Sequence, residues 1–125
     1  MKVTKKAAEA LWASVEVWSR KTEGAPHKHR YGTDACPCCQ EYYDNSCAGC
    51  PIEQKTGDRL CEGTPYLGVE VLLDAMVGAY YQCDFVLTRT YLEDPGVFRK
   101  LFSANVQAEY EWLTDLACEL EVGNE

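Results

Sequence analysis

Six of the eight cysteines of this chain lie within one short stretch, between Cys36 and Cys61. Thiols at this density form disulfides in an oxidising compartment and act as metal ligands in a reducing one. The first residues decide between the two, because Lys5, Lys6 and Glu9 interrupt every apolar run that a secretory signal would need. We therefore expect a cytoplasmic protein whose reduced cysteines bind a metal.

Two C-x-x-C pairs, Cys36/Cys39 and Cys47/Cys50, together with Cys61, supply the candidate ligands. Two residues between ligands allow both sulfurs of a tight turn to face one ion. Four of these five cysteines would complete a tetrahedral shell. A second solution uses Cys36, Cys39, Cys50 and Cys61, because only seven residues separate Cys39 from Cys47. The spacing leaves the choice of four open.

The other cysteines are expected to have lesser roles. Cys38 adjoins a ligand candidate and should point away from the metal, while Cys83 and Cys118 should be small core or boundary residues. Zn²⁺ is the expected metal and a [4Fe–4S] cluster the alternative, because four thiolates suit both. The Cys50-Pro51 step is also similar to the end of ferredoxin ligand runs. Buried thiols without a metal are the remaining alternative.

Apolar residues at helical spacing predict a mainly α fold of about three helices packed together, with the cysteine-rich loop between the first two. Residues 1–125 should form a single domain. Helices are expected over residues 3–20, 66–92 and 95–121, and the metal-binding loop over 27–65.

The apolar positions of the three predicted helices should face a shared core. They are Val3, Ala7, Leu11, Val15 and Trp18, then Val69, Leu72, Leu73, Met76, Val77, Tyr80 and Tyr81, then Phe98, Phe102, Val106, Tyr110, Leu113, Ala117 and Leu120. Trp12 widens the first of these faces and is also expected in the core. Thr64 before Pro65, and Asp94 before Pro95, predict the starts of the second and third helices.

The net charge of −8 is unevenly distributed along the chain. Residues 1–59 carry nine Lys and Arg against eight Asp and Glu, whereas residues 60–125 carry three against twelve. An acidic half repels phosphates, so the net charge disfavours nucleic acid as a partner and leaves only the N-terminal half for such contact. The candidate contacts there are His27, Lys28, His29, Arg30, Lys55 and Arg59, with Tyr42 and Tyr43 available to stack on bases.

Four carboxylates of the third predicted helix suggest a second surface: Glu109, Glu111, Asp115 and Glu119. They crowd toward a helix C-terminus, where the macrodipole disfavours negative charge. We expect this outer face either to aid solubility or to present phosphate-like charge to a partner protein. A solvated face is the simpler interpretation of both charged clusters.

Sequence signatures of enzymes are absent from the chain: no H-E-x-x-H, no zinc-deaminase pattern, no P-loop and no G-x-G-x-x-G. A closed shell of thiolates also lacks the open position of a catalytic zinc. Catalysis is therefore not expected, and no catalytic residue is assigned. No stretch approaches 20 apolar residues, so no membrane span is expected.

The spacing of the motif, C-x-x-C, a Tyr, C-x-x-C-P-I, Thr-Gly and C-x-G-T-P-Y, resembles a family of small phage and prophage proteins of uncharacterised function. The residues that carry the resemblance are Cys36, Cys39, Tyr42 or Tyr43, Cys47, Cys50, Pro51, Ile52, Thr56, Gly57, Cys61, Gly63, Thr64, Pro65 and Tyr66. The resemblance covers about the first half of the chain. It implies a phage-linked origin, in the cytoplasm of a bacterial host, and a shared five-cysteine framework to which Cys38 is an addition.

Three functions follow as hypotheses. The first is a metal-stapled protein that binds a host or phage protein, as an acidic modulator of nucleic-acid machinery. The second is a zinc-containing nucleic-acid-binding regulator that uses the basic flank of the cysteine loop. The third is an iron–sulfur redox or sensor protein.

Overall fold

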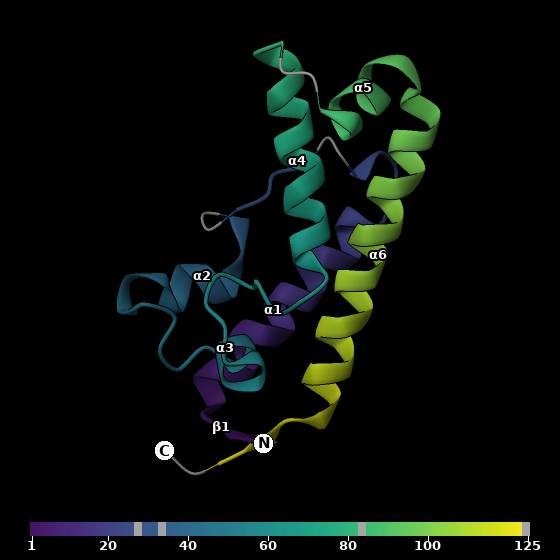
Figure 1. The fold of residues 1–125 in the computed structure, drawn as a ribbon. Coiled ribbons are helices and arrows are strands. Elements are labelled where there is room, and N and C mark those ends of the chain that lie inside the picture. The colour runs from purple at the N-terminus through teal and green to yellow at the C-terminus, as the bar shows by residue number, and fades with distance from the viewer. Residues whose placement is uncertain (27–28, 33–34, 83–84, 124–125) are drawn as a thin grey trace.

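The computed structural model describes residues 1–26, 29–32, 35–82 and 85–123 and is mainly helical, as the periodicity predicts (Figure 1). The elements are β1 (Lys2–Val3), α1 (Lys5–Lys21), α2 (Pro37–Tyr42), the 3₁₀ turn η3 (Tyr43–Asn45), α3 (Pro51–Thr56), α4 (Tyr66–Tyr80), α5 (Val86–Glu93), α6 (Pro95–Glu119) and β2 (Glu121–Val122). Among the described residues there are thus six α-helices rather than three. The cysteine loop contains α2 and α3, and the second predicted helix divides into α4 and α5.

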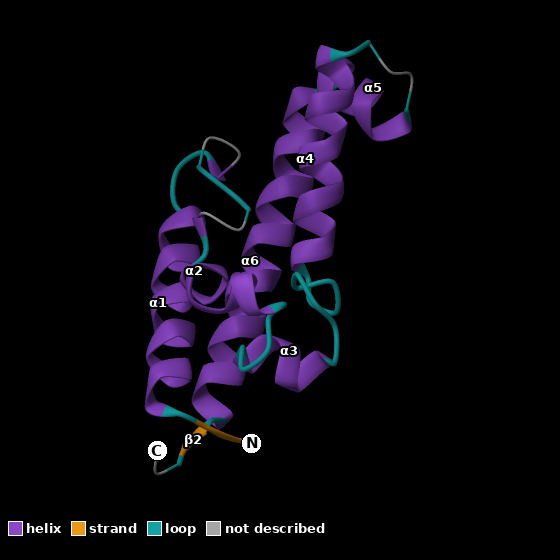
Figure 2. Cartoon of the chain, turned by 90° about the vertical axis from the view of Figure 1, so that its left-hand side faces the viewer, coloured by secondary structure: helices purple, strands orange, loops and turns teal. Residues whose placement is uncertain are grey.

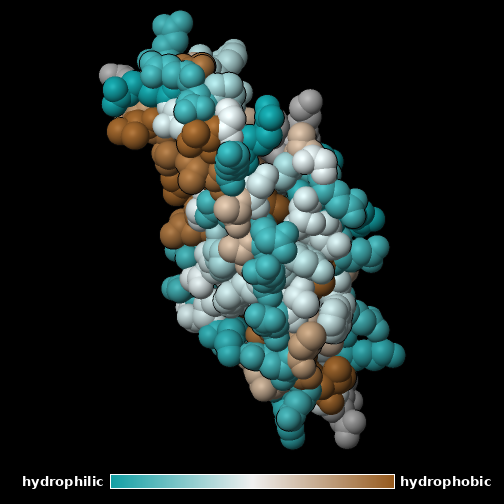
Figure 3. Space-filling view, turned by 90° about the vertical axis from the view of Figure 1, so that its right-hand side faces the viewer, coloured by the Kyte–Doolittle hydropathy of each residue, from teal (hydrophilic) through white to brown (hydrophobic). Residues whose placement is uncertain are grey.

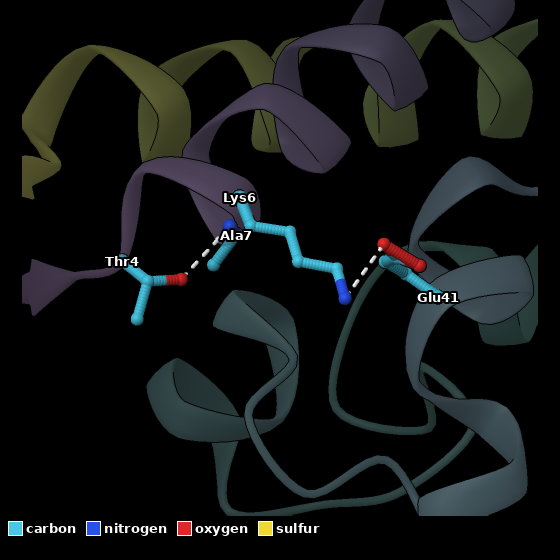
Figure 4. Close-up of polar contacts among 4 residues, drawn as sticks. All are labelled: Thr4, Lys6, Ala7 and Glu41. Carbon is cyan, nitrogen blue, oxygen red and sulfur yellow. Dashed lines mark hydrogen bonds and ion pairs between the residues drawn. The ribbon is translucent and has the colours of Figure 1, made fainter. Parts of the chain in front are cut away.

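Helix α1 begins at a threonine cap and is tied to α2 by an ion pair. The Thr4 hydroxyl accepts a hydrogen bond from the backbone N–H three residues later, at 3.1 Å, which satisfies one free amide of the first turn. Lys6 Nζ lies 3.1 Å from Glu41 Oε1 on α2 (Figure 4). Trp18 is buried as predicted, but the prediction that Trp12 packs in the core is wrong, because 48% of its surface is exposed.

Helices α4 and α5 form a hairpin where one helix region was predicted. Gln82, in the turn between them, has a φ of 60°, a left-handed conformation in which a right-handed helix ends. The buried Thr88 hydroxyl then donates to the Ala75 carbonyl at 3.0 Å and anchors α5 on α4. Leu87 and Tyr91, on the same helix, are half-buried and pack against the core.

Helix α6 is the longest element, at 25 residues, and starts where Asp94 and Pro95 predict. The Asp94 carboxylate accepts a hydrogen bond from the Val97 N–H at 3.3 Å. Its predicted stripe is buried at five positions and half-buried at Tyr110 and Leu120. The five are Phe98, Phe102, Val106, Leu113 and Ala117.

The upper part of the molecule, made by the end of α4, by α5 and by the start of α6, extends past α1 (Figure 2). Val77, Tyr80 and Tyr81 lie on this part of α4 and are exposed, so their predicted place in the core is wrong. The helical spacing of these residues is correct. No other element covers that side of α4 in the described chain, because α1 does not reach so far.

The two ends of the described chain meet in a short parallel sheet. Strand β1 pairs with β2, and Val3 lies opposite Val122 in the register. Val3 therefore belongs to a strand rather than to the first helix, and its side chain is buried beside Ala7 and Ala8 at the base of α1. The sheet joins the start of α1 to the end of α6, the two helices that carry most of the core.

Candidate metal and ligand site

The six cysteines of the loop converge on one region beside α1, where Ser14 contacts two of them, Cys36 and Cys38. Cys36 precedes α2, Cys38 and Cys39 lie in its first turn, and Cys50 precedes α3. Cys47 and Cys61 come from the turns before α3 and before α4. In the part of the chain that the structure describes, no disulfide joins two cysteines.

Two of the thiols occupy the same position at the starts of two short helices. Cys36 is the N-cap of α2 and Cys50 the N-cap of α3, and each is followed by a proline in the first helical position. Proline has no N–H, so the amides that follow it are the ones free to donate to the sulfur. The backbone amides of Ile52 and Glu53 near Cys50, and that of Cys39 near Cys36, help to lower the pKa of each thiol.

Cys38 lies at the centre of the cluster rather than outside it. Its side chain is 1% exposed, and its single S–H lies within reach of the sulfurs of both Cys36 and Cys50. The neighbouring Cys38 thiol is the main cause that lowers the pKa of Cys50 to about 7, and the Cys38 and Cys39 thiols hold the pKa of Cys36 well below its usual range. The prediction that Cys38 points away as a bystander is wrong.

Cys47 and Cys61 have an unusual backbone. Their φ angles are 64° and 62°, in the left-handed region that residues other than glycine rarely adopt. The preceding residues, Ser46 and Leu60, also have positive φ, at 55° and 59°. Such conformations cost free energy and persist where the surroundings or a function require them. Each pair of left-handed residues, Ser46 with Cys47 and Leu60 with Cys61, ends in a cysteine of the cluster.

A small cavity of about 10 Å³ lies among five of the thiols. These are Cys38, Cys39, Cys47, Cys50 and Cys61. The volume is about that needed for one water molecule. Among the described side chains, however, no three Cys, His, Asp or Glu already form a group that would hold a metal ion. The thiols instead hydrogen-bond to one another, so coordination would require them to rotate.

A larger cavity of about 210 Å³ adjoins the cluster on its other side. Cys39 and Cys61 line both cavities, while Cys36 faces only the larger one. The remaining wall includes three aromatic residues, Trp18, Tyr31 and Tyr66, and two buried ionisable residues, Lys21 and Glu109. This cavity was not predicted from the sequence.

Glu109 does not lie on the predicted acidic surface. It is 1% exposed, and its Oε2 accepts a hydrogen bond from the Thr64 hydroxyl at 3.1 Å. Burial raises the pKa of Glu109 to about 8. The position was predictable, because Glu109 follows Val106 by three residues and precedes Leu113 by four, on the buried face of α6. The assignment of Glu109 to a partner face is therefore wrong.

Lys21 is the second buried ionisable residue that the sequence analysis missed. It follows Trp18 by three residues, on the buried side of α1, and is only 4% exposed. Its Nζ lies 5.0 Å from the ring centroids of both Trp18 and Tyr31. Burial lowers the pKa of Lys21, and the charge of the nearby Cys36 thiolate partly opposes that shift.

The remaining charged candidates are exposed and are partly paired with each other. Lys55, from the proposed nucleic-acid contact, lies 2.7 Å from Glu119, from the proposed acidic face. One residue of each predicted cluster is therefore paired with the other cluster, in an ion pair that joins α3 to α6. The other candidates that the structure describes are exposed: His29, Arg30, Arg59, Glu111 and Asp115. His27 and Lys28 lie outside the described residues.

Two cysteines lie away from the cluster. Cys118 is exposed near the end of α6, so its prediction as a small core or boundary residue is wrong. Cys83 lies outside the described residues. The exposed thiol of Cys118 provides a matched control for substitutions within the cluster.

Ser14 connects α1 to the thiols, and its removal should weaken the site. Its fully buried hydroxyl donates to the Ala10 carbonyl at 3.1 Å, accepts from the Cys38 N–H at 3.3 Å and lies 3.7 Å from Cys36 Sγ. Ser14→Ala should lower the free energy of unfolding by roughly 1–2 kcal/mol, because the buried Cys38 N–H loses its acceptor. Urea denaturation measures the change. Ser19→Ala, in the same helix, is the control and should have little effect; equal effects would contradict the role of Ser14.

Within the part of the chain that the structure covers, none of the helices combines the length and apolar character of a membrane span. Comparisons with protein-family models, with curated proteins and with solved structures found no match to this chain.

Proposed function

We propose that this protein is an acidic protein-binding module that binds its partner through the outer face of α4 and the adjoining start of α5. The observation that carries this proposal is that α4 has apolar residues around its whole circumference, although other helices pack against only one side of it. The exposed apolar side chains are Leu67, Val71, Val77, Tyr80, Tyr81, Phe85 and Val86. Figure 3 shows hydrophobic surface gathered at this end of the molecule. Contiguous apolar surface of this kind is typical of protein interaction sites.

The charges on the same face specify the chemistry of the partner. Glu70 and Asp74 are exposed on α4, among the exposed apolar positions Leu67, Val71 and Val77. The whole chain also carries a net charge of −8. A partner that presents apolar side chains flanked by lysine or arginine matches this face in both hydrophobicity and charge. An acidic partner, including a second copy of this face, would be repelled.

Zinc bound by the cysteine cluster is the second part of the proposal. Four thiolates, drawn from the five around the small cavity and from Cys36, would close a tetrahedral shell around Zn²⁺. The ion-sized cavity, the left-handed cysteines and the two capped thiols support this assignment. The metal would stabilise α2 and α3 against α1, with no open position for catalysis.

Two model peptides test the protein-binding proposal. They are amphipathic helices of equal length and leucine content, one with a lysine polar face and the other with a glutamate polar face. The lysine peptide should bind, with an affinity that falls as salt rises, and the glutamate peptide should not. Val77→Ser with Tyr81→Ser should weaken binding roughly tenfold, because these side chains supply the apolar contact. Isothermal titration calorimetry measures both.

Matched substitutions separate the two acidic surfaces. Glu70→Gln with Asp74→Asn should lower the affinity and its salt dependence, since both charges lie on the proposed face. Glu111→Gln with Asp115→Asn removes the same number of charges from α6 and should leave binding unchanged. All four sites are exposed, so stability should change little. A loss of binding in the α6 pair alone would refute the assignment to α4.

A further inference from the structure

The larger cavity has aromatic walls that hold one another in place. Trp18 packs against Tyr31 and Tyr66, with ring centroids 5.6 Å and 5.7 Å apart, and Tyr31 also packs against Phe102 at 5.6 Å. The Tyr31 hydroxyl donates to the Pro26 carbonyl, which fixes the ring from its far end. The cavity is therefore preformed, and a ligand would not have to order these side chains.

Glu109 lines this cavity, and one of its carboxylate oxygens has no hydrogen-bond donor beside it. Its Oε2 is bonded to Thr64, whereas Oε1 is buried and has no hydrogen-bond partner among the described residues. Oε1 is an acceptor when the carboxylate is ionised, and it remains one when the proton sits on Oε2 in the Thr64 contact. Buried polar atoms are nearly always satisfied. A donor on a bound molecule would satisfy this one.

Lys21 gives the cavity a donor on another wall. Its ammonium group lies against the faces of Trp18 and Tyr31 and carries three N–H donors. A second cation in the cavity would be repelled by this charge, and an anion would be repelled by the carboxylate of Glu70, which also lines the cavity. A hydrocarbon would leave Oε1 unsatisfied. The walls thus favour a neutral, flat molecule with a donor on one edge and an acceptor on another.

We propose that this cavity binds a heteroaromatic molecule of the nucleobase class. An N–H edge of the ring donates to Glu109 Oε1, a ring nitrogen or carbonyl accepts from Lys21, and the ring faces pack on Tyr31 and Tyr66. Aromatic side chains bind bases in this way in many proteins. The volume of 210 Å³ is below the range of drug-sized pockets, which limits the occupant to a single ring system.

Binding of two matched purines tests the proposal on the full chain. 9-Methyladenine carries an exocyclic amino donor, and 9-methylpurine is the same ring without it. Titration followed by tryptophan fluorescence and by calorimetry should give saturable one-to-one binding of 9-methyladenine. The affinity for 9-methylpurine should be roughly tenfold lower, because Oε1 then stays unpaired. 1-Methylcytosine, which also carries an amino donor, extends the test to a smaller ring.

Variants of Glu109 complete the test. Glu109→Gln keeps a carbonyl acceptor in the same place and should bind 9-methyladenine within a few fold of the unmodified chain. Glu109→Leu removes the acceptor at similar volume and should bind it roughly tenfold more weakly. Glu111→Gln, on the exposed side of α6, should change nothing. Absence of saturable binding by all the bases, or equal binding of the two purines, would overturn the proposal even if Glu109→Leu did not fold.

Discussion

Replacing Cys50 by serine is expected to lower the free energy of unfolding by more than about 4 kcal/mol in the zinc-bound protein. The binding free energy of a structural metal is folding free energy, and serine is a poor zinc ligand. Cys50 also lies beside the amides that start α3, which help to lower the pKa of its thiol. Thermal unfolding followed by circular dichroism, with and without a chelator, measures the effect, and the chelator should destabilise the unmodified protein to a similar extent.

The exposed Cys118 supplies the control. Cys118→Ser removes one thiol at no cost to the cluster and should leave both metal content and unfolding unchanged. Native mass spectrometry gives the stoichiometry and separates one Zn²⁺ from a [4Fe–4S] cluster by mass. If Cys50→Ser and Cys118→Ser lower stability equally, or if the chelator has no effect, the zinc proposal fails. Serine variants at the other five loop cysteines then identify the four ligands.

Stability should fall as pH rises from about 4.5 to about 8, because of Glu109. Folding raises the pKa of this carboxyl from its ordinary 4.5 to about 8, so the folded chain binds the proton more tightly than the unfolded chain. The contribution to stability is complete below pH 4.5, declines through this window and is constant above it. Its size is at most about 5 kcal/mol. Urea denaturation across the window measures the slope.

Glu109→Gln isolates this contribution from the titration of the thiols. The amide cannot ionise, so the variant should be more stable than the unmodified protein at pH 8 and should lose the Glu109 part of the slope. Near pH 4 the two proteins should differ by less, because Glu109 is then protonated in both states. A variant that retained the full slope would show that other groups cause it.

Local interactions made much of the fold predictable. The stripe of α1 contains Leu11, Val15 and Trp18 at helical spacing, and Asp94 with Pro95 marks the start of α6. Both signals depend on neighbouring residues along one helix. The grouping of the loop cysteines was likewise predictable, because C-x-x-C spacing is a local property.

The wrong predictions of burial and exposure have a different origin, because burial depends on which other elements pack against a residue. Tyr80 and Tyr81 have the spacing of a core face but lie beyond the reach of α1. Trp12 is on the outer side of α1, where 48% of its surface is exposed. The helical spacing of Glu109 and Lys21 indicated that both side chains are buried. A charged side chain, however, is usually predicted to lie at the surface. The place of Cys38 follows from the helical conformation of α2. Adjacent side chains on a helix do not point in opposite directions, so Cys38 and Cys39 can both face the cluster.

The two thiols shared by both cavities have a thermodynamic consequence. Cys39 and Cys61 line the ion-sized space on one side and the aromatic cavity on the other. If zinc draws in either sulfur, both walls change, and the affinity of the larger cavity for its proposed ligand would then change with occupancy of the metal site. Linkage makes this coupling reciprocal and equal in free energy in both directions. The zinc affinity of the proposed metal site would then depend on whether a ligand occupies the larger cavity.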